Sequence, residues 1–296
     1  MLEVKNLCKT FGDKTAVDKI SFQVKPGVIT GLLGPNGAGK TTTMRLITGF
    51  LQPTEGSVYY QGTEIKPNST ELKQKLGYLP ESAALYQDML VHEYLEFIAK
   101  ARGITDDIDK KINAMVELCE LKPHYHYQIG QLSKGLRQRV MLAGTLVHDP
   151  EIIILDEPTS GLDPNQISHI RELIKKLGKE KILILSTHIL QEVEDVCDEV
   201  IIIHQGKIVA NSPVSALQEH NQVLVKTEAN RQELENAIPG AIVSSLAEND
   251  ANTFLLRKND LQPEEVFRAL CAIGKPVTEL RAYKKSLESI FEELTR

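Results

Sequence analysis

The sequence predicts an α/β core with an inserted helical subdomain, followed by a small C-terminal α+β domain. Three observations lead to this fold class. Short β-rich runs alternate with helical patterns in the first part of the chain, as in a sheet covered by helices. Between about residues 90 and 147 the apolar residues recur at helical spacing instead. A new apolar pattern begins after residue 220, so we expect one domain over residues 1–220 and a second over residues 221–296.

The strands of the core are predicted by short, uninterrupted apolar runs. These runs cover residues 28–33, 152–155 and 181–186. Such continuous apolar character is typical of parallel strands that are buried on both faces. A helix is expected to begin at Lys40, shortly after the first run. The core is therefore predicted to be a parallel or mixed sheet covered by helices.

The helical subdomain is predicted by apolar residues spaced three or four apart, with no β-type run among them. They are Val91, Tyr94, Leu95, Ile98, Ile112, Met115, Val116 and Cys119. The C-terminal domain has mixed character. Its predicted strands cover residues 223–227, 241–246 and 253–257, and its predicted helices cover residues 231–237, 263–273 and a last segment from Ser286. This succession indicates a small α+β sandwich.

Charge and hydropathy argue against two functions for the chain acting alone, namely nucleic-acid binding and transport across a membrane. The formal net charge is −6, whereas phosphate backbones attract proteins with an excess of Lys and Arg, so we expect no nucleic-acid partner. No stretch approaches the roughly 18 uninterrupted apolar residues of a membrane span. Any step across a membrane would therefore need a separate chain.

A glycine-rich segment follows the first predicted strand and fits the pattern GxxxxGK[ST]. It consists of Gly34, Pro35, Asn36, Gly37, Ala38, Gly39, Lys40 and Thr41. In this pattern the backbone N–H groups of the loop and the start of the helix bind phosphates. Lys40 is expected to neutralise the β and γ phosphates, Thr41 to bind Mg²⁺, and Thr42 to contact a phosphate oxygen. The alternative, a tight glycine turn with an exposed lysine, is disfavoured by the flanking strand and helix.

Two acidic residues end the apolar run at residues 152–155. Asp156 is predicted to hold Mg²⁺, and Glu157 to orient or deprotonate the attacking water. The carboxyl end of a central parallel strand opens onto the ligand crevice, which is where such acids are useful. Two solvated carboxylates at the end of an ordinary strand are the alternative. The phosphate loop elsewhere in the chain favours the catalytic interpretation.

Three further motifs complete a family pattern. They are Leu132-Ser133-Lys134-Gly135-Leu136 before the acid pair, Ser160-Gly161-Leu162-Asp163 after it, and Ser186-Thr187-His188 after the next strand. With the phosphate loop, in this order and spacing, the chain resembles the ABC ATPases over residues 1–220. The resemblance implies a P-loop ABC ATPase domain that binds ATP and Mg²⁺ and hydrolyses ATP.

The resemblance also implies how these motifs work together. Two copies would stack head to tail, so that Ser133 and Gly135 of one copy contact the γ-phosphate held by the other. His188 would contact the γ-phosphate in its own subunit and act with Lys40 and Glu157 in catalysis, and Asp163 would connect the two sites. Phe11 falls where the family places an aromatic that stacks on adenine; a core Phe at the end of a first strand is the alternative.

Two positions depart from the usual family pattern. The motif LSKGL replaces LSGGQ, so that Lys134 adds a cation beside the expected γ-phosphate position. After the predicted strand at residues 76–79, Glu81 stands where most members carry a Gln that reaches Mg²⁺ and senses the membrane partner. Glu81 can still reach the metal, but its charge alters the hydrogen bonding expected there.

The loops at residues 77–81 and 85–89, the motif Leu132-Ser133-Lys134-Gly135 and the closing segment 286–291 resemble the ABC-2 exporter branch. Within that branch they resemble the gliding-motility-associated ATP-binding subunit. The implied function is that of a transporter's ATP-binding subunit on the inner, cytoplasmic face of the cell membrane. Its partners would be a second copy of the chain and a separate transmembrane permease. An ABC ATPase that acts on ribosomes or DNA is the alternative; a single set of motifs and the negative charge favour transport.

Overall fold

The computed structural model describes residues 1–66, 69–82, 85–217, 222–245, 252–258, 261–283 and 287–295. The chain divides into two compact units, Met1–Val214 and Ser215–Leu294. The domain boundary expected between residues 220 and 221 lies outside the described residues.

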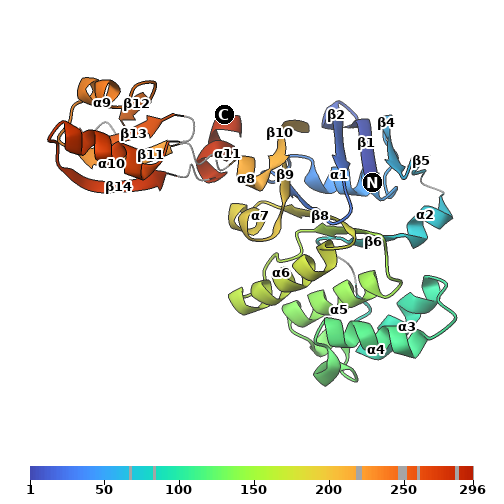
Figure 1. The fold of residues 1–296 in the computed structure, drawn as a ribbon. Helices are drawn as coiled ribbons and strands as arrows, with labels where there is room; N and C mark the ends of the chain where they lie inside the picture. Colours follow the sequence, from blue (N-terminus) through green and yellow to red (C-terminus); the bar gives the residue numbers. More distant parts are fainter. Residues whose placement is uncertain are drawn as a thin grey trace. The chain divides into compact units, whose positions relative to one another are not determined.

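A six-stranded sheet, counted over the described residues, forms the centre of the first unit (Figure 1). Its strands are β3 (Ile29–Leu33), β6 (Leu76–Leu79), β7 (Ile152–Asp156), β8 (Ile182–Thr187), β9 (Glu199–His204) and β10 (Lys207–Pro213). Their order is β10-β9-β3-β8-β7-β6, and only the pairing of β10 with β9 is antiparallel. The three apolar runs of the sequence are thus the neighbouring strands β3, β8 and β7.

Both faces of this sheet are buried, which explains the continuous apolar runs. Every residue of β3, β7 and β8 is buried. Alternate residues such as Ile152 and Ile154 share one core with helix α1 (Lys40–Ile47). Because successive side chains of a strand point to opposite faces, Ile153 and Leu183 face the other side. Helices α6 (Pro164–Gly178) and α7 (Leu190–Val196) contact β8 there.

A second sheet in this unit is antiparallel and was not predicted. It has the order β2-β1-β4-β5, with strands β1 (Leu2–Phe11), β2 (Lys14–Val24), β4 (Glu55–Tyr60) and β5 (Thr63–Glu64). Register shifts interrupt the pairing of β1 with β2 and with β4. These irregularities break the simple alternation of apolar and polar residues by which an antiparallel strand is predicted.

The stretch between β6 and β7 is helical, as its apolar spacing predicted. Helices α3 (Val91–Ala101), α4 (Ile108–Leu118) and α5 (Lys134–Leu146) contact one another (Figure 1). Val91, Leu95 and Ile112 are buried among them. Two 3-10 turns, Lys122–His124 and Ile129–Gln131, also lie in this stretch. The short helix α2 (Thr70–Gln74) precedes β6. Among the described residues, no helix combines the length and apolar character needed to cross a bilayer.

The second unit is an antiparallel sheet with helices. Its strands β11 (Gln222–Thr227), β12 (Ile242–Ser245), β13 (Thr253–Arg257) and β14 (Val277–Tyr283) have the order β12-β13-β11-β14. The helices are α9 (Arg231–Ala237) and α10 (Pro263–Ala272), with α8 (Val214–Leu217) before them and α11 (Leu287–Thr295) at the end. The expected ends at Leu246 and Ser286 lie outside the described residues. The predicted fold class is confirmed, but β14 was missed.

A partly buried histidine after α5 makes the stability of the first unit depend on pH. His148 Nε2 lies 3.1 Å from the carbonyl oxygen of Leu76, so Nε2 must carry the hydrogen. Its buried Nδ1 has no partner within the described residues. Burial, with the nearby charge of Arg102, lowers the pKa of His148 from 6.5 to about 4. Folding therefore favours the neutral ring.

Stability is expected to fall as the pH is lowered from about 6.5 to about 4, because the unfolded chain then binds a proton that the folded chain excludes. Above pH 6.5 the ring is neutral in both states and adds no pH dependence. His148→Gln should flatten this part of the curve in urea unfolding experiments between pH 7.5 and 4.5. His126→Gln, at an exposed position, is the matched control. Equal slopes in all three proteins would contradict the assignment to His148.

Candidate functional site

The segments that follow the parallel strands meet at one edge of the sheet. Parallel strands bring their carboxyl ends together, and here β3, β6, β7 and β8 lead into the glycine-rich loop, Glu81, Glu157 and His188. A pocket of about 640 Å³ opens at this edge, within the usual range for small-molecule sites. It is lined by Phe11, Lys14, Ala16, Pro35, Asn36, Gly37, Gly39, Lys40, Thr41, Thr42, Glu81, Glu157, Ser160 and His188.

The glycine-rich loop wraps the start of α1. Gly39 has φ 109°, and a Cβ atom there would lie 2.5 Å from the carbonyl oxygen of Ala16, so only glycine fits. Lys40 is the first residue of α1, and its ammonium donates to the carbonyl oxygens of Gly34 at 2.7 Å and Pro35 at 3.4 Å. The loop therefore aims a buried cation at the pocket.

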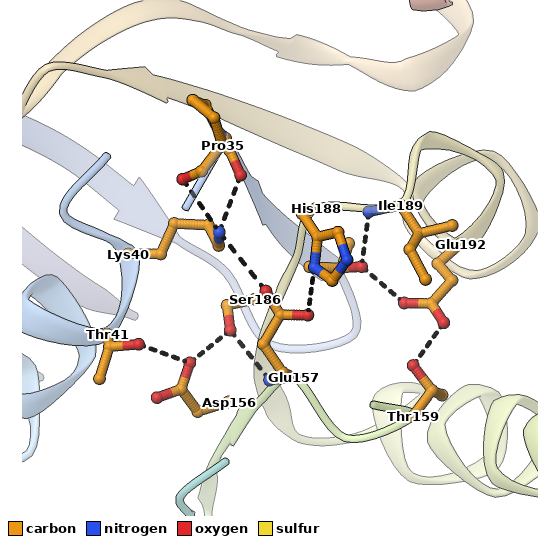
Figure 2. Close-up of polar contacts among 12 residues, drawn as sticks. Pro35, Lys40, Thr41, Asp156, Glu157, Thr159, Ser186, His188, Ile189 and Glu192 are labelled. Atoms are coloured by element: carbon orange, nitrogen blue, oxygen red, sulfur yellow. Dashed lines mark hydrogen bonds and ion pairs between the residues drawn. The ribbon is translucent and has the colours of Figure 1, made fainter. Parts of the chain in front are cut away.

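Asp156 ends β7 beneath the pocket and is fully buried. Its Oδ1 accepts hydrogen bonds from Thr41 Oγ1 at 3.2 Å and Ser186 Oγ at 2.6 Å (Figure 2). Its Oδ2 is buried with no partner in the described part of the chain. A carboxylate oxygen without a partner beside a threonine hydroxyl is a donor set suited to Mg²⁺, which prefers oxygen ligands.

Glu157 lies between two basic side chains at the pocket wall. Its Oε1 is 3.4 Å from Lys40 Nζ, and its Oε2 is 2.9 Å from His188 Nδ1 (Figure 2). The backbone of Glu157 has φ 48°, in the left-handed region, and its N–H donates to Ser186 Oγ at 3.0 Å. The carboxylate is thereby fixed at the end of β7 and directed into the pocket.

Most predicted site residues meet at this pocket. Gly34 and Ala38 belong to the loop but are buried, so they shape its backbone and do not line the pocket. Phe11 is 49% exposed and lines the pocket, so the alternative of a core phenylalanine is wrong. Glu81, which follows β6, also lines the pocket. The predicted phosphate, acid and aromatic positions are therefore neighbours in space.

Ser133 and Gly135 do not line this pocket. Ser133 caps α5 by accepting a hydrogen bond from the N–H of Leu136 at 3.3 Å. A Cβ atom on Gly135 would lie 2.3 Å from atoms of the Gln166 side chain. Lys134 turns toward the loop after Glu157, since a Cβ atom on Gly161 would lie 2.0 Å from its Nζ. Within one chain, this motif contacts the Ser160–Asp163 segment and not the pocket.

Three kinds of site residue were missed by reasoning from sequence. Lys14 pairs with Phe11 across the β1–β2 hairpin, and Ala16 follows it; the turn at Gly12 was the available signal. Ser160 was recognised only as part of a motif, yet it lines the pocket. Ser186 bonds both Asp156 and Glu157, which its place beside His188 did not reveal.

Comparisons with known proteins agree with this geometry. The family described as ABC transporter matches residues 17–160. The uncharacterized ABC transporter ATP-binding protein YxlF of Bacillus subtilis is 33% identical over 295 residues, 98% of each chain. The bacitracin transport ATP-binding protein BcrA of Enterococcus faecalis is 32% identical, over 99% of this chain and 96% of BcrA.

One solved structure of a similar ATP-binding cassette shows that cassette as a dimer after ATP hydrolysis. It is a dimeric, post-hydrolysis state bound to ADP and Pi, and it matches with TM-score 0.65 and 26% identity over 72% of this chain and 99% of its own. These relatives are matched over almost their whole length and give the alternative of a ribosome or DNA protein no support. The chain therefore belongs to the ABC transporter ATP-binding proteins and is the ATP-hydrolysing subunit of such a transporter.

Proposed function

We propose that this subunit binds MgATP between two copies of itself and couples the closing of that dimer to export by a separate transmembrane protein. The observation that carries the proposal is the Glu157 carboxylate, which is held between Lys40 and His188 at the wall of an ATP-sized pocket. A fixed carboxylate beside a phosphate-binding loop can orient an attacking water and accept its proton.

The nucleotide would lie along the pocket from Phe11 to the start of α1. Phe11 would stack on adenine, and its half-exposed ring supports this role. The loop from Gly34 to Gly39 would donate backbone N–H groups to the phosphates, with Lys40 as the cation and Thr42 as a further hydroxyl donor. Developing negative charge on the γ-phosphate would be met by Lys40 and by the imidazole of His188.

Thr41, Asp156 and Glu81 would hold Mg²⁺. The unpartnered Oδ2 of Asp156 supports this assignment, and Glu81 lines the same pocket. When bound, Mg²⁺ supplies charge neutralisation on the β and γ phosphate oxygens. Ser186 would keep Asp156 oriented through its 2.6 Å hydrogen bond.

The second copy would complete the site with Ser133 and Gly135, in agreement with their position away from the pocket of their own chain. The same arrangement would let Asp163 link the two sites. Assignment to the ABC-2 exporter branch is supported by the relative that bears a bacitracin transport name. The proposed likeness to the gliding-motility subunit rests on the sequence resemblance alone. The subunit would then act at the inner face of the cell membrane, bound to its permease.

The test is to purify the full chain from its own cells in mild detergent and to measure ATP hydrolysis with and without the membrane protein that accompanies it. A transmembrane partner that stimulates hydrolysis is the expected result. Ribosomal proteins in its place, with hydrolysis that depends on ribosomes, would overturn the proposal.

Glu81→Gln should leave MgATP affinity within about twofold, because Lys40, Thr41 and Asp156 provide the main contacts. Coupling to the partner should change, since an amide restores the neutral hydrogen-bonding group usual in the family. The measurement is the ratio of partner-stimulated to basal hydrolysis in both proteins. Identical ratios would show that Glu81 carries neither the metal nor the signal.

We further propose that residues 1–220 are the ABC ATPase domain, with residues 90–147 as its helical subdomain, and that residues 221–296 are an accessory domain. A chain ending at residue 220 is expected to keep MgATP affinity within about threefold, because the described residues that line the pocket all lie between positions 11 and 188. Isothermal titration of the truncated and full chains provides the comparison. A folded fragment that fails to bind ATP would show that the boundary is misplaced.

A further inference from the structure

A further carboxylate lies next to the candidate site but does not line its pocket. Glu192 belongs to α7, and its side chain is only 3% exposed. Acidic side chains are almost never fully buried unless they are paired, so its partners indicate what it does. Figure 2 shows Glu192 between the segment after Glu157 and the segment that carries His188.

Each oxygen of Glu192 accepts a hydrogen bond from a threonine hydroxyl, one from the turn after Glu157 and one from the end of β8. Thr159 Oγ1 donates to Oε1, and Thr187 Oγ1 donates to Oε2 at 2.6 Å. Both threonines are themselves buried. Arg171 Nη2 lies 3.9 Å from Oε1 and offsets part of the charge, while its Nη1 bonds Asp195 at 2.5 Å. One buried carboxylate thus joins the turn after Glu157 to the end of β8 by charge-assisted hydrogen bonds, which are stronger than neutral ones.

The two threonines lie close in sequence to the residues that make the Glu157–His188 contact. Thr187 directly precedes His188, and its hydroxyl also accepts the N–H of Ile189 at 3.0 Å, so the backbone is fixed on both sides of the imidazole. Thr159 lies in the turn closed by the hydrogen bond from Ser160 N–H to Glu157 O at 3.1 Å. The His188 side chain is 46% exposed, so packing alone does not determine its orientation.

We infer that Glu192 is a positioning residue that sets the 2.9 Å contact between His188 and Glu157 by tying together the two segments that carry them. The inference rests on the proposed catalytic roles of Glu157 and His188. Glu192 touches neither nucleotide nor water in this scheme; it acts through His188. Its removal should therefore affect the rate of hydrolysis more than the binding of ATP.

The test compares Glu192→Gln with wild type in the full chain. A glutamine has the same shape but presents an amide N–H₂ to one of the two hydroxyl donors, so one link must be lost or reversed. We expect kcat to fall by about tenfold, with the Kd for ATP unchanged within about twofold. Glu194→Gln, an exposed carboxylate of the same helix, is the control and should retain the wild-type kcat.

A double-mutant cycle separates positioning from general support of the fold. In a His188→Ala background, Glu192→Gln should change the residual rate by less than about twofold, because the group through which it acts is gone. The same fold-loss in both backgrounds, or an unchanged kcat in Glu192→Gln alone, would overturn the inference. So would a parallel loss of kcat and ATP affinity, which indicates a structural role only.

Thr159→Val is a second test of the same link, and it leaves the buried charge of Glu192 in place. It removes one donor to Glu192 and should lower kcat in the same direction, with a less than additive effect when combined with Glu192→Gln. Wild-type kcat in Thr159→Val would count against the inference even where Glu192→Gln fails to fold. Glu157→Gln, measured alongside, separates a failure of this inference from a failure of the proposed function. If Glu157→Gln hydrolyses ATP at the normal rate, the proposed catalytic role of Glu157 is wrong.

Discussion

Replacing Glu157 by Gln is expected to lower kcat by about 10²- to 10⁴-fold while MgATP still binds. Glutamine keeps the length of the side chain and one acceptor oxygen, but it has no charge with which to take a proton from water. The Lys40 and His188 contacts hold the carboxylate in one place. The other acid among the described lining residues, Glu81, is proposed to serve Mg²⁺. Phosphate release by the full chain measures the effect.

The same variant should accumulate the ATP-bound dimer. Size-exclusion chromatography with light scattering is expected to show a dimer with MgATP and a monomer with MgADP, because Ser133 and Gly135 of each copy would bind the γ-phosphate of the other. Glu180→Gln, at an exposed position in the same unit, is the matched control and should behave as wild type. Wild-type turnover by Glu157→Gln, with the membrane partner present, would remove the residue from catalysis.

Replacing Lys40 by Ala is expected to weaken MgATP binding by roughly 10²-fold or more. A hydrogen bond to a charged group contributes about 1.5–3 kcal/mol, and Lys40 would make two such bonds to the β and γ phosphates. The variant also leaves the buried Glu157 with His188 as its only basic neighbour from the contacts described above. Calorimetric titration of the full chain gives the Kd directly.

Lys110→Ala, at an exposed position of α4, controls for the general loss of a positive charge. Its affinity for MgATP should match that of wild type, as steering by distant charge is weak at physiological salt. If Lys40→Ala binds as tightly as this control, the glycine-rich loop is not the phosphate site.

The parallel strands and the site motifs could be predicted from sequence because each leaves a local signal. A strand buried on both faces, such as β7, is a continuous apolar run, and the acids that end it are adjacent in the chain. The strand β14 gave no such signal, because none of its residues is fully buried. Its place in the sheet depends on pairing with β11, which is a contact between distant segments.

The supports of the site were unpredictable for the same reason. Glu192 meets Thr159 across 33 positions and Ser186 meets Asp156 across 30, and no spacing rule connects such residues. Lys134 shows a different limit. Its charge is a departure from the family pattern that is visible in the sequence. A long, flexible side chain can take several directions, however, and here it lies over Gly161 of its own chain.

At Glu157, the backbone conformation lowers the stability of the fold, whereas the side chain at that position is the one that hydrolysis would need. A side chain other than glycine, asparagine or aspartate in the left-handed region costs on the order of 1 kcal/mol or more. Selection for thermal stability alone would therefore favour glycine at this position. Screens for more thermostable variants of this subunit would enrich proteins that are more stable but no longer hydrolyse ATP. Stabilising such an ATPase without losing its activity means leaving this strained turn alone and making substitutions elsewhere.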